Sequence, residues 1–313
     1  MKAIILKAPG GIDQLQYTEL PQPAVGENDV LIQVKAISLN PVDVKTRAGK
    51  GVYGRLKELT PIVIGWDIAG IVAAAGASVT TFRPGDAVFG MVNFPGHGQG
   101  YAEYVAAPAH HLAHKPANIS FEEAAAATLA PLTAWQAMAN HPQVGPGKRV
   151  LIHAAAGGVG HFAVQLAKHR GAHVIGTSSA ANKDFVLGLG ADEHIDYRAQ
   201  PFEQVAGSVD FVLDTLGGDT IDRSLTIINR SGAIISIVSG LSEAVVQKSK
   251  DKGVDGSFML VQSNGADLEA IAALLAKGSL KAHVSQVFSF SEMGAAHLHV
   301  ETGRTVGKIV VRV

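Results

Sequence analysis

The pattern of apolar and polar positions divides the chain into a first section of short strands and a later section of alternating strands and helices. In the first section, Gly, Pro and Asn residues separate short apolar, β-branched runs, which is typical of strands joined by turns. The runs are 3–6, 29–37, 68–74 and 87–91. An alanine-rich stretch from Phe121 to Asn140, interrupted at Pro131, predicts helix. We therefore expect a β-rich region over about the first 120 residues.

The later section predicts a doubly wound α/β domain. Its strand-like runs are uniformly apolar, which indicates strands covered on both faces, as in a mostly parallel sheet. The predicted strands are 149–154, 173–177, 194–197, 210–214 and 233–238, and the predicted helices between them are 159–170, 182–189 and 220–228. An amphipathic helix around 268–275 and a strand at 308–313 follow.

Composition narrows the functional classes. A chain of 313 residues predicts two domains. Its 26 Lys and Arg nearly balance 27 Asp and Glu, which argues against a nucleic-acid partner. The absence of cysteine excludes disulfides, a thiolate nucleophile and Cys-bound metal clusters. The longest apolar run, 62–79, contains Asp67 and three glycines, so we expect buried strands there rather than a membrane helix. With no signal peptide visible, a cytoplasmic location is expected.

A glycine-rich turn lies between the strand at 149–154 and the next helix. It reads Ala155-x-Gly157-x-x-Gly160, with Ala155 in place of the first glycine of the usual dinucleotide-binding pattern. Gly157 would let the backbone approach a pyrophosphate, and Gly160 would let the helix pack closely on the strand. The amides of Gly158 and Val159 at the helix start would complete an anion site. The alternative is a tight turn that binds nothing.

The residues after the neighbouring strands favour NADPH. An NAD site usually carries an acidic residue about 20 residues after the glycine turn, and none stands there. Ser178 and Ser179 follow the second strand instead, and with Lys183 and Tyr197 they suit a 2′-phosphate. The alternative is a polar loop with a solvated lysine. Thr215 and Leu216 follow the strand that ends at residue 214, at the sheet edge where cofactor contacts gather.

Several short motifs occur in a family's order. They are Asn40-Pro41-Val42-Asp43, residues 65–70, 83–90 and 100–105, Leu132-Thr133-Ala134-Trp135, the glycine turn and residues 307–311. With these motifs, nearly the whole chain resembles the zinc-independent quinone oxidoreductase branch of the medium-chain dehydrogenase/reductase superfamily. The resemblance implies a GroES-like β-rich catalytic domain over 1–122 and 264–313 and a Rossmann domain over 123–263. It also implies a homodimer.

The resemblance also suggests roles for individual residues. Asn40, Thr133 and the segment 236–239, which includes Val238, would lie near the nicotinamide. Zinc-dependent relatives carry a cysteine where this chain has Asn40, and a His-Glu pair where it has Trp66-Asp67, so no metal is expected. His110, His111 and His114 have candidate ligand spacing but lie in what resembles a surface connection.

Three more side chains around Asn40 have expected roles. Tyr53 is either a proton donor, as in some enoyl-reductase relatives, or a lid or packing residue. Asp43 and Asp67 are expected to fix loops through backbone hydrogen bonds.

The function implied is NADPH-dependent hydride transfer to a small-molecule quinone or α,β-unsaturated carbonyl. Such substrates accept hydride conjugately, so a metal Lewis acid is dispensable. Two alternatives stay open: an enoyl-thioester reductase, and an NADPH-binding protein with little turnover.

Overall fold

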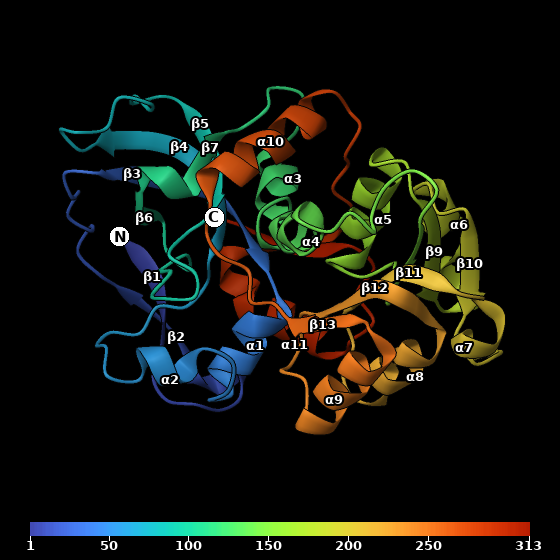
Figure 1. Ribbon diagram of the computed structural model, residues 1–313. Helices are drawn as coiled ribbons and strands as arrows, with labels where there is room; N and C mark the ends of the chain where they lie inside the picture. Colours follow the sequence, from blue (N-terminus) through green and yellow to red (C-terminus); the bar gives the residue numbers. More distant parts are fainter. The chain divides into compact units, whose positions relative to one another are not determined.

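The chain forms two compact units in the computed structural model, which describes residues 1–313 (Figure 1). Unit 1 comprises residues 1–132 and 262–313, and unit 2 comprises residues 133–261. The expected boundaries were at 122 and 264. The first boundary lies later because α3 (Phe121–Ala126) packs against β3 (Asp29–Leu39), β4 (Asp67–Ala75) and β15 (Lys308–Arg312), all in unit 1.

Unit 1 is built on a seven-stranded sheet. Its strand order is β14-β15-β3-β4-β5-β7, and β6 also pairs with β3. The other strands of this sheet are β5 (Ala87–Met91), β6 (Tyr104–Pro108), β7 (Leu112–His114) and β14 (Val284–Ser289). A separate hairpin pairs β1 (Lys2–Leu6) with β2 (Leu15–Glu19). Because β15 pairs with β3 opposite Leu39, the last strand in the chain completes the sheet begun by the first ones.

The helices of unit 1 cover and connect this sheet. They are α1 (Pro41–Arg47), α2 (Tyr53–Leu56), α3, α10 (Gly265–Ala276) and α11 (Met293–Glu301). The predicted helix from Phe121 to Asn140 is two helices, α3 and α4 (Leu129–Ala139). The interruption precedes Pro131, which lies in the first turn of α4, where a missing N–H costs no helical hydrogen bond. Every helix of the chain is too short or too polar to cross a lipid bilayer.

Unit 2 contains a six-stranded sheet with the order β10-β9-β8-β11-β12-β13, and every neighbouring pair is parallel. The strands are β8 (Arg149–Ile152), β9 (His173–Ser178), β10 (Glu193–Asp196), β11 (Val209–Asp214), β12 (Ile228–Ser236) and β13 (Asp255–Phe258). The helices are α5 (Gly160–His169), α6 (Lys183–Gly188), α7 (Phe202–Val205), α8 (Asp219–Ile227) and α9 (Glu243–Lys252).

Both faces of this sheet are buried, as the apolar runs predicted. On one face Leu151, Ile175 and Val212 join a core that includes residues of α7, α8 and α9. On the other face the alternate residues Val150 and Val174 are also fully buried. The α/β fold class predicted for this part of the chain is therefore confirmed.

The segment 240–262, for which the sequence pattern predicted no helix or strand, contains α9 and β13. The Ser242 hydroxyl accepts a hydrogen bond from the amide of Val245 at the start of α9, and Gly253 ends the helix with a φ of 70°. Only Val245 and Ser249 of α9 are buried. The helix was missed because its sequence is mostly charged and polar, so it carries almost no apolar periodicity.

Candidate active site

The residues predicted to bind a cofactor in unit 2 follow the carboxyl ends of its parallel strands. Residues 155–160 follow β8, Ser178 and Ser179 end or follow β9, Tyr197 follows β10, Thr215 and Leu216 follow β11, and Val238 follows β12. Parallel strands place these ends at one edge of the sheet. The chain runs from β8 outward to β9 and β10 and later returns to β11 on the other side of β8. Ligands of open α/β sheets bind at such a reversal point.

The glycine turn depends on close backbone approach at Gly160. The chain leaves β8 through Ala154, whose φ of 46° is left-handed, and α5 begins at Gly160. A Cβ atom on Gly160 would lie 2.1 Å from the carbonyl oxygen of Ala154, which is far inside contact distance. On Gly157, a Cβ atom would lie 3.1 Å from the same oxygen and would meet little else. The close packing expected at Gly160 is therefore present, and the approach of a pyrophosphate to Gly157 stays a prediction.

A buried histidine behind the turn ties three strand ends together. His153 is 1% exposed, with Nε2 3.0 Å from the Ser224 hydroxyl and Nδ1 3.2 Å from the Thr177 hydroxyl. Ser224 donates its own hydrogen to the Thr220 carbonyl at 2.7 Å, so it accepts from His153 Nε2–H, and Thr177 donates to Nδ1. Thr215 donates to the His153 carbonyl at 2.8 Å. Burial lowers the pKa of His153 to about 3, so the ring is neutral.

Asp214 fixes the loops that follow β11 and β12. Its carboxylate accepts hydrogen bonds from the amides of Leu216 and Gly217, at 3.3 Å and 3.0 Å, and from the Ser236 hydroxyl at 2.8 Å. The carboxylate is fully buried, whereas the Leu216 side chain is exposed. Val238 is half-buried near Gly217. Asp214 therefore positions two predicted cofactor residues without being accessible itself.

The four residues predicted to bind a 2′-phosphate lie at the end formed by β9, β10 and α6. Ser178 is nearly buried and its hydroxyl oxygen is 2.7 Å from His194 Nε2. Lys183 is exposed as the first residue of α6. Tyr197 is 54% exposed, and the Arg198 guanidinium lies over its ring at 5.6 Å. Ser179, which follows Ser178 in the chain, is half-buried.

Asn40 in unit 1 belongs to a fully buried polar cluster. Its Nδ2 donates to Asp67 Oδ2 at 2.8 Å, and its Oδ1 accepts a hydrogen bond from the Lys308 ammonium. The ammonium also donates to the Leu39 carbonyl at 2.9 Å and lies 3.6 Å from Asp67 Oδ2. Both ends of the Asn40 side chain are thereby fixed, which leaves its second Nδ2 hydrogen and the second lone pair of Oδ1 for a bound molecule.

Burial and like charge dominate the electrostatics of this cluster. Burial, with Asp67 nearby, raises the pKa of Asp43 to about 7. Burial also raises the pKa of Asp67, and the Lys308 ammonium opposes that change. Asp43 accepts a hydrogen bond from the Asn40 amide at 2.7 Å, and Asp67 accepts one from the Leu129 amide at 3.1 Å. Both carboxyl groups thus make the backbone hydrogen bonds expected of them.

Tyr53 and Thr133, the other two predicted catalytic residues, lie in different units. Tyr53 begins the short helix α2 of unit 1 and is half-buried. Thr133 is buried on α4 at the start of unit 2.

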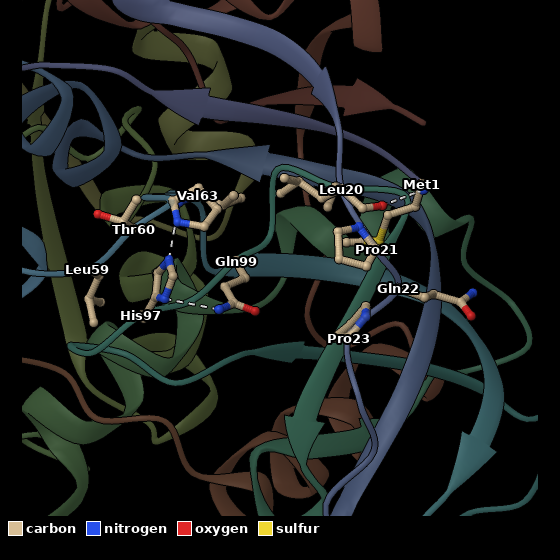
Figure 2. Close-up of a pocket in the computed structure, with 12 residues that line it drawn as sticks. Met1, Leu20, Pro21, Gln22, Pro23, Leu59, Thr60, Val63, His97 and Gln99 are labelled. Carbon is tan, nitrogen blue, oxygen red and sulfur yellow. Dashed lines mark hydrogen bonds between the residues drawn. The ribbon is translucent and has the colours of Figure 1, made fainter.

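Unit 1 also contains an open pocket of about 380 Å³, shown in Figure 2. Its lining is largely apolar and includes Leu20, Pro21 and Val63. The His97 ring points toward Gln99 and accepts a hydrogen bond from the Val63 amide at 3.1 Å, and burial lowers the pKa of this ring. None of the residues predicted for the active site lines this pocket.

Both halves of the chain match described protein families. Residues 26–117 match the alcohol dehydrogenase GroES-like domain, and residues 189–311 match a family described as zinc-binding dehydrogenase. A quinone oxidoreductase from Triphysaria versicolor is 35% identical, with 96% of this chain and 95% of that protein aligned. The chain belongs to the medium-chain dehydrogenase/reductase superfamily. This membership confirms the resemblance drawn from the sequence motifs and the GroES-like and Rossmann classes of the two units.

Two further superfamily members support the quinone oxidoreductase branch. The structure of a quinone oxidoreductase from Coxiella burnetii has a TM-score of 0.94 and 38% identity, covering 100% of this chain and 99% of that one. An NADPH-dependent alkenal/one oxidoreductase from Arabidopsis thaliana is 33% identical over 99% of this chain and 79% of that protein.

The side chains that this chain carries at the zinc-ligand positions of its zinc-dependent relatives do not fit a catalytic zinc ion. The Asn40 oxygen accepts from an ammonium, and Asp67 faces the same positive charge. Trp66 offers only an N–H, which it donates to the Gly96 carbonyl at 2.8 Å. His111 Nδ1 already accepts from the Asn93 amide at 3.1 Å. No group of three or more His, Asp or Glu side chains is arranged to hold a metal ion.

The sequence did not identify the roles of His153, His194 and Lys308, whose partners are 16 to 269 residues away in the chain. Lys308 carried a signal in that it lies in the last of the family motifs, residues 307–311. Asp214 was recognised only as the end of a strand at the cofactor edge, and its contact with the Ser236 hydroxyl was not foreseen.

Proposed function

We propose that the protein is an NADPH-dependent reductase that transfers hydride to a quinone or α,β-unsaturated carbonyl without a metal ion. The observation that carries the proposal is the set of loops at the carboxyl edge of the unit 2 sheet, with the glycine turn at its centre. Some relatives are named quinone or alkenal/one oxidoreductases, which agrees with the proposed function.

The coenzyme would be held along this edge. The amides of Gly158 and Val159 would face the pyrophosphate, next to the start of α5 and beside Ala155 and Gly160. Gly157 would permit the close approach, since its own amide donates to the Ala154 carbonyl at 2.8 Å. Ser178, Ser179, Lys183 and Tyr197 would bind the 2′-phosphate. Thr215, Leu216 and Val238 would line the nicotinamide end, with the His153 and Asp214 networks fixing their loops.

When bound, NADPH supplies the hydride. The chain's own residues would orient the acceptor and stabilise the negative charge that develops on its carbonyl oxygen. Asn40 and Thr133 are proposed to contact the nicotinamide ring, following the family resemblance. Asn40 has one donor hydrogen for this purpose, because its other Nδ2 hydrogen is donated to Asp67. Tyr53 is proposed as the proton donor, with a lid role as the alternative.

The test is NADPH oxidation by protein that has been dialysed against a chelator. Acceptors are a benzoquinone, a phenanthrenequinone, a short enone and an enoyl thioester. We expect turnover with a quinone or the enone, unchanged by the chelator, and a loss of turnover in Tyr53→Phe if Tyr53 donates a proton. Stoichiometric zinc lost together with activity would contradict metal independence. Turnover of the thioester alone would indicate an enoyl-thioester reductase, and binding without turnover a cofactor-binding protein. A homodimer and a cytoplasmic location remain predictions.

A further inference from the structure

His194 lies beside the residues proposed to bind the 2′-phosphate, although no sequence motif includes it. It comes from β10, which pairs in parallel with β9 so that His194 lies opposite Gly176 and Asp196 lies opposite Ser178. The His194 ring is half-buried, and its Nε2 is 2.7 Å from the hydroxyl oxygen of the nearly buried Ser178. Ser178 and His194 therefore form a hydrogen-bonded pair that joins the two strand ends.

The Ser178 hydroxyl has one hydrogen and two acceptors within reach, His194 Nε2 at 2.7 Å and the Ser179 carbonyl oxygen at 3.2 Å. A phosphate at this strand end would be a stronger acceptor than either group. Ser178 would then donate its hydrogen to the phosphate and accept a hydrogen bond from His194 Nε2–H.

The charges around His194 favour a neutral ring in the free protein. Burial lowers the pKa of His194, Asp196 on the same strand raises it, and Lys183 on α6 lowers it. The remaining titratable groups on elements packed against β10 either lie at the far end of β9 or are paired or exposed. They are His173, Glu193, Asp184, Glu203 and Arg198. The Glu203 carboxylate accepts two hydrogen bonds from the Arg223 guanidinium, at 3.0 Å and 2.8 Å, so its negative charge is paired.

A bound 2′-phosphate would reverse this balance. Near neutral pH it carries close to two negative charges. A dianion next to Ser178 favours the protonated imidazole, since an opposite charge at close range stabilises the charged form. We propose that His194, acting through Ser178, is a second and proton-dependent determinant of the preference for a 2′-phosphorylated nucleotide. This inference rests on the proposed NADPH function and adds to it a residue that takes up a proton when the coenzyme binds.

The experiment measures the dissociation constants of NADPH and NADH by fluorescence titration, from about pH 6.5 to about pH 8.5, where the phosphate is mostly dianionic. In wild type the preference for NADPH should fall about fivefold to tenfold across this range as His194 loses its proton. In His194→Gln the preference should be independent of pH, because the amide can still donate to Ser178 but cannot titrate. Calorimetry in buffers of different ionisation enthalpy should show proton uptake with NADPH, none with NADH, and none in the variant.

Two further variants make the result specific. His169→Gln removes an exposed imidazole at the opposite end of α5 from the glycine turn and should keep the wild-type pH dependence. Lys183→Ala should weaken NADPH about tenfold to a hundredfold at every pH and leave NADH unchanged. If His194→Gln keeps the wild-type pH dependence and proton uptake, the inference is wrong while the proposed function stands. If neither nucleotide binds, the proposed function itself fails.

Discussion

At the scale of single residues, the glycine turn separates two uses of glycine that look alike in the sequence. Gly160 is needed by the protein itself, because a side chain there would collide with the Ala154 carbonyl. At Gly157 a Cβ atom would lie 3.1 Å from the same oxygen, a tight contact that a small shift relieves, and would meet no other backbone atom. The first is thus a packing requirement, and the second is open to a ligand.

Substitution of these two glycines should therefore give opposite results. Gly160→Ala should lower the free energy of unfolding by about 1–3 kcal/mol, because backbone atoms must shift to admit the methyl group. Gly157→Val should cost less stability than Gly160→Ala, because its Cβ atom would lie 3.1 Å rather than 2.1 Å from the Ala154 oxygen. It should lose NADPH affinity, because the branched side chain occupies the proposed pyrophosphate position. Urea unfolding and NADPH titration measure the two effects. An unchanged NADPH titration in a well-folded Gly157→Val would remove the cofactor role of this turn.

The residues that the sequence identified differ physically from those that it missed. The glycine turn and the residues after the strands are recognisable because their roles follow from local spacing at a strand end. Asp43 is also local, since its partner Asn40 is three residues away. The roles of His153 and His194 depend on hydroxyl groups brought near by strand pairing and helix packing. A histidine in an apolar run carries no sign of such partners before the fold is known.

At the scale of elements, three strands of unit 1 meet at Lys308. It is the first residue of β15, donates to Leu39 at the end of β3, and faces Asp67 at the start of β4. Lys308 is 3% exposed and Asp67 is fully buried. A buried ion pair of this kind contributes little beyond what two apolar residues would, but losing one partner leaves an uncompensated charge.

Lys308→Met should therefore lower the free energy of unfolding by about 3–5 kcal/mol. The double variant Lys308→Met, Asp67→Asn should recover most of that loss, because it removes the unpaired carboxylate as well. Urea unfolding of the two single variants and the double variant forms a double-mutant cycle. Additive effects would show that Lys308 and Asp67 are not coupled.

Some helices and strands could not be predicted from the sequence pattern. The long strands and the helices next to the parallel sheet were predicted because they are buried on a regular period. The edge strand β13 and the polar helix α9 were not, because few of their residues are buried. The edge strand β7 was not, because its three residues are too few to show a period. Elements at the margin of a sheet are specified by their neighbours more than by their own periodicity.

At the scale of the whole molecule, each unit encloses a neutral histidine. In unit 2 this is His153, and in unit 1 it is His297, which lies 2.9 Å from the Tyr101 hydroxyl. Burial lowers the pKa of both to about 3, whereas an exposed histidine titrates near 6.5. Unfolding in acid lets each ring take up a proton, so each contribution to stability is present above about pH 6.5 and is lost as the pH falls.

The two units should differ in their sensitivity to acid. In unit 1 the pKa of Asp43 is raised to about 7, so between about pH 7 and pH 4 the folded state binds a proton that the unfolded state does not. That uptake, together with the raised pKa of Asp67, stabilises unit 1 as the pH falls and offsets the losses from His297, His97 and His111, whose pKa values burial lowers. Unit 2 has no such compensation for His153, and lowered pKa values of Asp192 and Glu203 add to its loss below about pH 4.5.

Tryptophan fluorescence can measure this difference, because Trp66 lies in unit 1 and Trp135 in unit 2. Trp135→Phe leaves a reporter for unit 1, and Trp66→Phe leaves one for unit 2. The urea midpoint reported by Trp135 should fall more steeply between about pH 7 and pH 4.5 than the midpoint reported by Trp66. Equal slopes, or a steeper fall in unit 1, would contradict the prediction.

The position of β15 inside its sheet has a consequence for how the protein is made. Synthesis proceeds from the N-terminus, so unit 2, which ends at Val261, has emerged before β15 (Lys308–Arg312) is translated. Until β15 arrives, β3 lacks its neighbour along residues 36–39, and Asp67 lacks its buried ammonium partner. The inserted unit can thus complete its fold on the ribosome while the unit that surrounds it cannot. Until β15 emerges, residues 36–39 of β3 form an unpaired strand edge, which is the kind of surface that promotes association between chains.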